Sequence, residues 1–215
     1  MDRLIPFTPD VYIDMIARYN EGVWPGHLAG FAMIWGIIAC ARRGGRVNAR
    51  IVLTIIAGFW IWVGYGFHIE HYAQLNWAAV AFGSIFIAQG GVILLWAGLA
   101  KTANVSLGLD RFSMLGGMLL LAAMALHPMF ANAVGWPLST MQTAGTTPLS
   151  MMLVNFGGFA FLRRRPPLWA VALPLLWGIW DGLWAWTLGL WPDFTVAAIA
   201  FIGGILCALP RPTHA

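Results

Sequence analysis

The chain has 215 residues, of which 60% are hydrophobic and only 9% are charged, and its formal net charge is +4. A soluble domain carries about 25% charged residues, so this composition excludes a water-soluble globule and indicates that lipid is the outer solvent. The positive charge does not predict nucleic-acid binding, because the basic residues lie in short loops between apolar runs and form no basic face.

Residues 1–22 are predicted to form an amphipathic segment ahead of the first membrane span. Val11, Met15 and Ile16 recur at helical spacing, whereas Asp10 and Asp14 fall on another face. Such a helix lies in the membrane interface, or it forms a lid over the outer mouth of the bundle. The acidic residues interrupt the pattern of a cleavable signal peptide, so the first span itself is expected to direct insertion.

Apolar runs fill residues 23–210 and predict a membrane-embedded helical bundle. A span needs about 20 apolar residues, and the fifth and seventh runs are short by this measure, so either of them extends into flanking residues or is partly re-entrant. The runs cover residues 24–41, 50–68, 77–99, 112–131, 148–162, 168–190 and 195–209. We therefore predict an all-α polytopic fold of about seven spans, followed by a cytoplasmic tail at 211–215.

The charged loop residues separate by sign if successive spans alternate in direction. The exceptions are Arg3 and Arg18, which lie with the acids. One end holds the basic residues Arg42, Arg43, Arg46, Arg50, Lys101, Arg111, Arg163, Arg164, Arg165 and Arg211, and the other holds the acidic residues Asp2, Asp10, Asp14, Glu21, Glu70 and Asp193. Because Lys and Arg are enriched in cytoplasmic loops, the N-terminus is predicted to lie outside and the C-terminus in the cytoplasm.

Ionisable side chains inside a bilayer are costly, so each one is a candidate for function. Asp181 and His127 lie about 20 Å along their spans from the basic end, and His27 lies just below the outer surface. Asp181 stands in a tryptophan-rich stretch, 177–186, which predicts a proton or cation site with aromatic walls. His27 or His127 is its expected partner, and an inter-helix hydrogen bond is the alternative. Gln89, near the middle of the third span, is a further ligand candidate.

A weaker pattern, at the outer end of the second span, is typical of a metal site. His68 and His71 are three residues apart, so they share a face if that turn is helical, and Glu70 lies between them. Imidazole suits zinc, copper, iron or nickel. The alternative is a polar turn wetted by lipid headgroups. No cofactor is strongly implied, although haem or a transition metal fits these residues.

Several short motifs along nearly the whole chain resemble an uncharacterised bacterial family of multi-pass inner-membrane proteins, a domain of unknown function. Relatives often have Pro-Cys-Pro-Thr where this chain has residues 146–149, and many lack an acid at Asp181. The motifs are Pro6–Pro9, Tyr19-Asn20, Trp24-Pro25, Asn76 with Ala78-Ala79, Phe82-Gly83, Gln89-Gly90, His127-Pro128, Gly135–Pro137, Gly145 with Pro148, and Pro174–Trp177. The resemblance implies a helical membrane fold in the bacterial inner membrane and carries no assigned activity.

Three classes of function stay open. The first is a small transporter or channel whose outward-facing polar vestibule takes a proton, a cation or a small solute. The second is a membrane-embedded redox protein that binds a metal or haem, and the third is a non-catalytic subunit of a membrane complex, since glycine ridges suit helix packing without any ligand. An enzyme is less expected, because no nucleophile and base are paired. The expected partners are the lipid bilayer and either a second copy of the chain or a larger complex.

Overall fold

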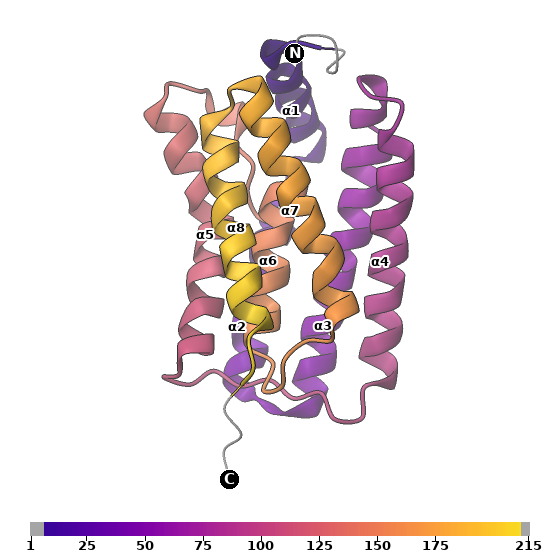
Figure 1. The fold of residues 1–215 in the computed structure, drawn as a ribbon, viewed down its shortest axis with the longest axis vertical. Coiled ribbons are helices and arrows are strands. Elements are labelled where there is room, and N and C mark those ends of the chain that lie inside the picture. The colour runs from indigo at the N-terminus through magenta and orange to yellow at the C-terminus, as the bar shows by residue number, and fades with distance from the viewer. Residues whose placement is uncertain (1–6, 212–215) are drawn as a thin grey trace.

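The computed structural model describes residues 7–211 and shows an elongated all-α bundle (Figure 1). Residues 1–6 and 212–215, and with them Asp2, Arg3 and most of the predicted tail, lie outside the described part. The α-helices of this part are α1 Pro9–Val23, α2 Gly26–Arg43, α3 Gly45–Trp62, α4 Ala79–Leu99, α5 Arg111–Ala133, α6 Pro148–Ala160, α7 Leu168–Leu188 and α8 Trp191–Ala208. The shorter helical turns are η1 Val63–Ile69, η2 Tyr72–Gln74 and η3 Leu138–Thr140.

Helix length supports fewer spans than the hydropathy pattern predicts. Within the described residues, five helical stretches are long and apolar enough to cross a membrane, and a sixth results if α1 and α2 are counted together. The short helix α6 has 13 residues, which is about 20 Å against the roughly 30 Å of a bilayer core. The prediction of seven full spans is therefore supported only in part: the first predicted span qualifies only together with α1, and the fifth is too short.

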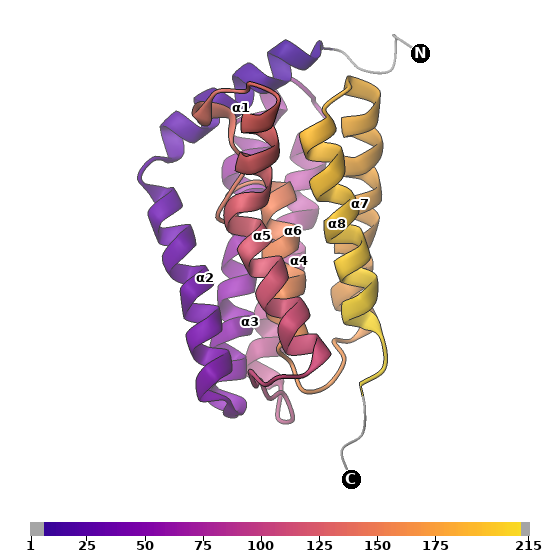
Figure 2. The ribbon, with the colours of Figure 1, turned by 90° about the vertical axis from the view of Figure 1, so that its left-hand side faces the viewer.

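Helix α6 is the central element of the bundle and is enclosed by its longer neighbours (Figure 2). All 13 of its residues are buried, and it contacts α3, α5, α7 and α8. It begins inside the bundle because residues 141–147 reach it as an irregular segment with a turn at 144–145, which we call the inner segment. Thr147 caps the helix and Pro148 occupies its first turn. The chain therefore reaches the helix by irregular backbone that is covered by protein, the condition under which a bilayer tolerates it.

The N-terminal helix α1 lies obliquely across one end of the bundle (Figure 2). It makes an angle of 81° with α2. Its apolar face does not point to lipid, because Met15, Ile16 and Tyr19 are buried against the rest of the protein. A helix is present at residues 9–23, within and just beyond the predicted amphipathic segment, and its place in the interface or as a lid stays a prediction.

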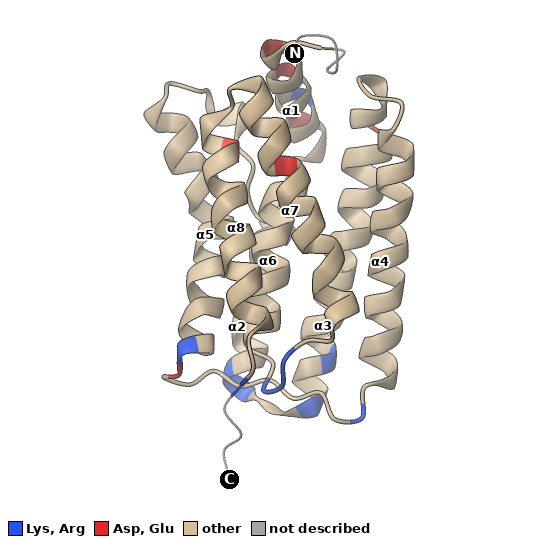
Figure 3. Ribbon diagram, viewed as in Figure 1, with Lys and Arg blue, Asp and Glu red and all other residues tan. Residues whose placement is uncertain are grey.

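Charged side chains collect at opposite ends of the bundle (Figure 3). We call these the acidic end, where α1 lies, and the basic end, where α2 meets α3. At the basic end the loop 101–110 joins three elements through its backbone: Gly45 and Val105 form one bridge, and Val105 and Leu162 form another. Together with Leu107, whose N–H donates to the Ala41 carbonyl at 2.9 Å, these bonds fix the spacing of the helix ends.

Candidate functional site

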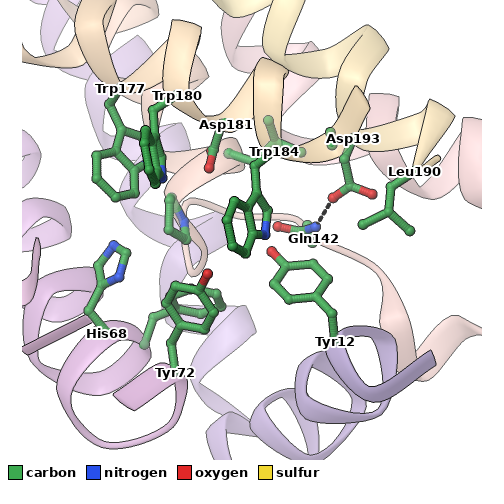
Figure 4. A pocket seen from close by; sticks show the side chains of 14 residues that line it. Tyr12, His68, Tyr72, Gln142, Trp177, Trp180, Asp181, Trp184, Leu190 and Asp193 are labelled. Atoms are coloured by element: carbon green, nitrogen blue, oxygen red, sulfur yellow. Dashed lines mark hydrogen bonds between the residues drawn. The ribbon is translucent and has the colours of Figure 1, made fainter. Parts of the chain in front are cut away.

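One partly enclosed cavity near the acidic end is lined by several polar side chains (Figure 4). We call it the acid-lined cavity. It lies between α1, η1, η2, the inner segment, α7 and the first turn of α8. Its lining residues are Tyr12, Phe67, His68, Tyr72, Gln142, Pro148, Leu149, Trp177, Trp180, Asp181, Trp184, Ala185, Leu190 and Asp193.

Two carboxylates line this cavity, and the set of lining residues contains no Lys or Arg. Asp181 comes from the middle of α7, and Asp193 comes from the start of α8. The sequence analysis placed Asp193 in a turn on the outer surface, and that placement is wrong: α8 begins at Trp191, so Asp193 lies in its first helical turn and is only 6% exposed. Pro192 explains the difference, because proline in the first turn starts a helix as readily as it forms a turn.

Aromatic rings make the walls of the acid-lined cavity, as the tryptophan-rich sequence predicts for Asp181. Trp177, Trp180 and Trp184 flank Asp181 on α7, and the Tyr12 and Tyr72 rings lie opposite them (Figure 4). These rings contact one another rather than standing alone. Trp180 stacks on Trp184 with centroids 6.0 Å apart, so the wall on the α7 side is continuous.

His68 enters the same cavity from η1. Its ring is fully buried and lies 4.6 Å from the Phe86 ring and 5.1 Å from the Trp177 ring, between centroids. The η1 segment is a π-helical turn, a form that occurs mostly as single turns at functional sites. Its wider turn changes which side chains face the bundle, so His68 points to α7 instead of continuing the face expected from α-helical spacing.

Several buried polar atoms around this cavity have no hydrogen-bond partner within residues 7–211. They are both ring nitrogens of His68, the indole nitrogens of Trp177 and Trp184, and one carboxylate oxygen of Asp193. Buried polar atoms are nearly always paired, so each exception calls for an explanation. Other such atoms lie elsewhere in the described part, for example on His27, Gln89 and Asn155, but those of His68, Trp184 and Asp193 border one cavity and favour a polar occupant there.

His127 lies behind the cavity rather than in it. Its Nδ1 accepts the Gln142 N–H at 3.0 Å, so a neutral ring carries its proton on Nε2, which lies 3.6 Å from the Asp193 carboxylate. The Gln142 side chain donates to the same carboxylate oxygen. The sequence analysis expected His127 as a partner of Asp181, whereas the structure places it beside Asp193 and uses it to hold the inner segment.

Pro128 explains how the inner segment is held against α5. Proline inside a helix leaves the carbonyl four residues earlier without its N–H donor, and in α5 this carbonyl belongs to Met124. The Thr143 hydroxyl donates to it at 2.7 Å, and the Ala144 N–H donates to the neighbouring Ala123 carbonyl at 2.9 Å. The kink thus supplies acceptors for a segment that has no regular secondary structure.

His27 takes part in a separate network on the opposite side of the inner segment. Its Nε2 lies 3.3 Å from the Asn20 side-chain oxygen, and the Asn20 amide donates to the carbonyls of Ser139 and Met141 at 2.7 and 2.9 Å. His27, His127 and Asp181 therefore do not face one cavity: only Asp181 lines it. Gln89 is buried on α4 and is not among the lining residues.

The suggested metal set does not assemble. Although His68 faces α7, the His71 Nδ1 is bonded to the Gly66 carbonyl at 2.7 Å and its ring packs 5.0 Å from the Tyr19 ring. Glu70 is exposed. Within residues 7–211, no three His, Cys, Asp or Glu side chains are grouped so that they could hold a metal ion. The π-helical turn is the physical reason, because it directs the two imidazoles to different sides.

The size of the acid-lined cavity limits its occupant. It offers about 20 Å³ to the centre of a water-sized molecule, and one water needs about 10–15 Å³ by this measure. One or two small species therefore fit in this conformation, and a drug-sized solute does not. Two carboxylates inside aromatic walls favour a positively charged occupant.

Sequence comparison places the chain in a group but does not identify its chemistry. No curated protein and no solved structure matches it. A family model does match over residues 9–214, nearly the whole chain, and it is described as a family of unknown function. This agrees with the resemblance drawn from the sequence motifs, and the long apolar helices agree with its membrane location. The chain belongs to the family of unknown function DUF6064.

Proposed function

We propose that this integral membrane protein is a small transporter that binds a proton or a small cation in the acid-lined cavity. One observation carries the proposal: Asp181 and Asp193 line the same cavity, and its lining residues include no Lys or Arg. The proposal keeps the outward-facing vestibule expected from the sequence and narrows its occupant, because the cavity volume favours species of about the size of water.

The electrostatic argument rests on the low polarity of the surroundings. Two carboxylates that share a buried site repel each other, and neither is solvated by bulk water. Both can be ionised only if a positive charge neutralises one of them. His127, 3.6 Å from Asp193, is one source of such a charge when it is protonated. The residues that line the cavity with Asp181 include no Lys or Arg, so an incoming proton or cation takes that role.

The orientation of the bundle in the membrane determines the side toward which the cavity would open. Because basic loops favour the cytoplasm, we place the basic end in the cytoplasm and the acid-lined cavity in the outer half of the membrane. Helix α1 then covers the outer entrance, with Tyr12 as its contribution to the lining. Movement of α1 away from α7 would open the cavity to the outside. In this arrangement the inner segment and α6 together make one of about seven crossings.

Transport assays in vesicles test the proposal. Purified protein is reconstituted with an internal pH dye or an internal dye for Na⁺ or K⁺, and a gradient of each ion is applied. We expect uptake by the wild type, and a loss of about a hundredfold in Asp181→Asn and in Asp193→Asn, because each variant removes a buried charge partner worth about 3 kcal/mol. Asp10→Asn is the matched control, since Asp10 is exposed on α1.

Three results would contradict the proposal. One is the absence of uptake of any of these ions by the wild type, and the second is normal uptake in both cavity variants. The third concerns direction. A cysteine introduced at the exposed Glu70 should react with an impermeant thiol reagent from outside intact cells, and reaction only after the cells are opened would reverse the assigned orientation.

A further inference from the structure

We infer that the ion carried in the acid-lined cavity is the proton, held by one or two bound water molecules, and that a metal cation or ammonium is excluded. This inference rests on the proposed function and makes it more specific. The evidence is the set of hydrogen-bonding atoms that face the cavity without a partner, together with the room available to satisfy them.

An indole group provides the first step. The Trp184 N–H group is buried without an acceptor among the described residues. An indole nitrogen can only donate, so the occupant must offer a lone pair. A metal cation has none to offer and is repelled by the positive end of an N–H bond. Ammonium has four donors and no acceptor. A water molecule accepts from the indole and still has two protons to donate.

The cavity also has hydrogen-bond acceptors without a partner, in addition to the unpaired indole donor. One oxygen of Asp193 is buried without a donor, and in neutral His68 one ring nitrogen is a donor and the other an acceptor, both without partners. A buried water typically makes about three hydrogen bonds. Water that accepts from an indole and donates to a carboxylate or to an imidazole would pair these atoms.

His68 adds a group that can hold the proton in transit. The two nitrogens of its ring allow a proton to arrive on one and leave from the other. The surrounding rings of Phe86 and Trp177 can stabilise the charged ring by cation–π attraction. Proton transfer would explain why both ring nitrogens of His68 are buried without a partner. Neither a metal site nor packing in the core explains this.

The transfer step balances without any other reactant. The O–H bond of protonated Asp181 breaks as its proton passes to the bound water, and one of the water's own protons forms an N–H bond on His68. Asp181 becomes a carboxylate and His68 becomes an imidazolium, so the proton has moved from α7 to η1. No atom is oxidised or reduced.

The test uses the same vesicles with the cations exchanged. A pH gradient is applied with Na⁺, K⁺ or ammonium outside, or with the bulky cation N-methylglucamine, while a lipophilic anion balances charge. We expect the rate of proton uptake to be the same in all four solutions. Trp184→Phe, which keeps an aromatic ring and removes the N–H, should lower the rate about tenfold, as the loss of one buried hydrogen bond predicts. Trp186→Phe is its control, because Trp186 is 58% exposed on the same helix.

A second variant and a second measurement distinguish a loss of proton transfer from a loss of folding. His68→Gln keeps a polar side chain of similar length and cannot carry the charge, so it should abolish uptake while the thermal unfolding temperature stays near that of the wild type. Infrared difference spectra should show a buried water band that is lost in Trp184→Phe and retained in Trp186→Phe. Uptake that requires Na⁺ or ammonium, or equal rates in the two tryptophan variants, would overturn this inference and leave the proposed function intact. Failure to move any ion would instead overturn the proposed function.

Discussion

Polar side chains at the basic end and at the acidic end of the bundle differ in how their hydrogen bonds are paired. At the basic end, cationic side chains donate to backbone carbonyls: Arg46 to Lys101, Arg50 to Gly98, and Arg211 to Phe159 and Ala160. Asp110 caps α5 by accepting two backbone N–H groups, and although burial raises its pKa, these bonds and the Ser113 hydroxyl hold the pKa below the ordinary value of 3.8. Each of these groups fastens one element to another.

At the acidic end the polar groups divide into two sets. Asn20, Tyr19 and His127 hold the inner segment, much as the arginines hold the basic end. His68 and the tryptophans of α7, in contrast, keep unpartnered polar atoms directed at a cavity. The comparison teaches that burial of a polar residue does not by itself mark a site. The useful distinction is whether its hydrogen-bonding atoms are already paired within the protein.

The largest effect that would test this division is expected at Gly30. A Cβ at this position would lie 2.3 Å from the Ala144 carbonyl oxygen, and the inner segment has little freedom to move because its backbone is bonded to α5. We expect Gly30→Ala to lower the free energy of unfolding by about 3 kcal/mol, measured by unfolding in mixed detergent micelles.

Gly91→Ala is the matched control for this substitution. Gly91 also lies within an apolar helix, and a Cβ there meets nothing within 4 Å. We expect it to be neutral, or to stabilise the protein by up to about 1 kcal/mol because alanine favours the helix. Equal losses in both variants would show that the inner segment is not held rigidly.

A smaller loss is expected when the hydroxyl of Tyr19 is removed. This hydroxyl donates to the Thr146 carbonyl and accepts from the Trp62 indole at 3.1 Å, so Tyr19→Phe leaves both groups unpaired. We expect a loss of about 2 kcal/mol in the same unfolding measurement, and no change in Tyr65→Phe, because Tyr65 is exposed. If Tyr19→Phe were as stable as the wild type, the network at the acidic end would not be structural.

The smallest effect is expected at the basic end. Arg211 bonds the last carbonyls of α6 and lies 4.1 Å above the Phe112 ring. In Arg211→Gln water can replace these bonds at the end of the bundle, so we expect a loss of only about 1 kcal/mol. A loss larger than that of Tyr19→Phe would reverse the comparison between the two ends.

The sequence by itself determined the membrane class, the all-α fold, most helix boundaries and the separation of basic from acidic residues. These properties depend on hydropathy and charge along the chain, and the helix limits of α4, α5 and α7 lie within two residues of the predicted ones. It also singled out Asp181 among its tryptophans. Each of these inferences needs only local composition and the period of a helix.

Only the tertiary structure decided which polar groups meet. Asp193 became a cavity residue because α8 begins earlier than expected, His127 turned to the inner segment, and a π-helical turn separated His68 from His71. The sequence already indicated that the fifth run is short, but only the structure shows that α6 is completely enclosed by protein and is preceded by irregular chain. Such pairings depend on the rotation and depth of neighbouring helices, which packing sets and which a one-dimensional pattern does not contain.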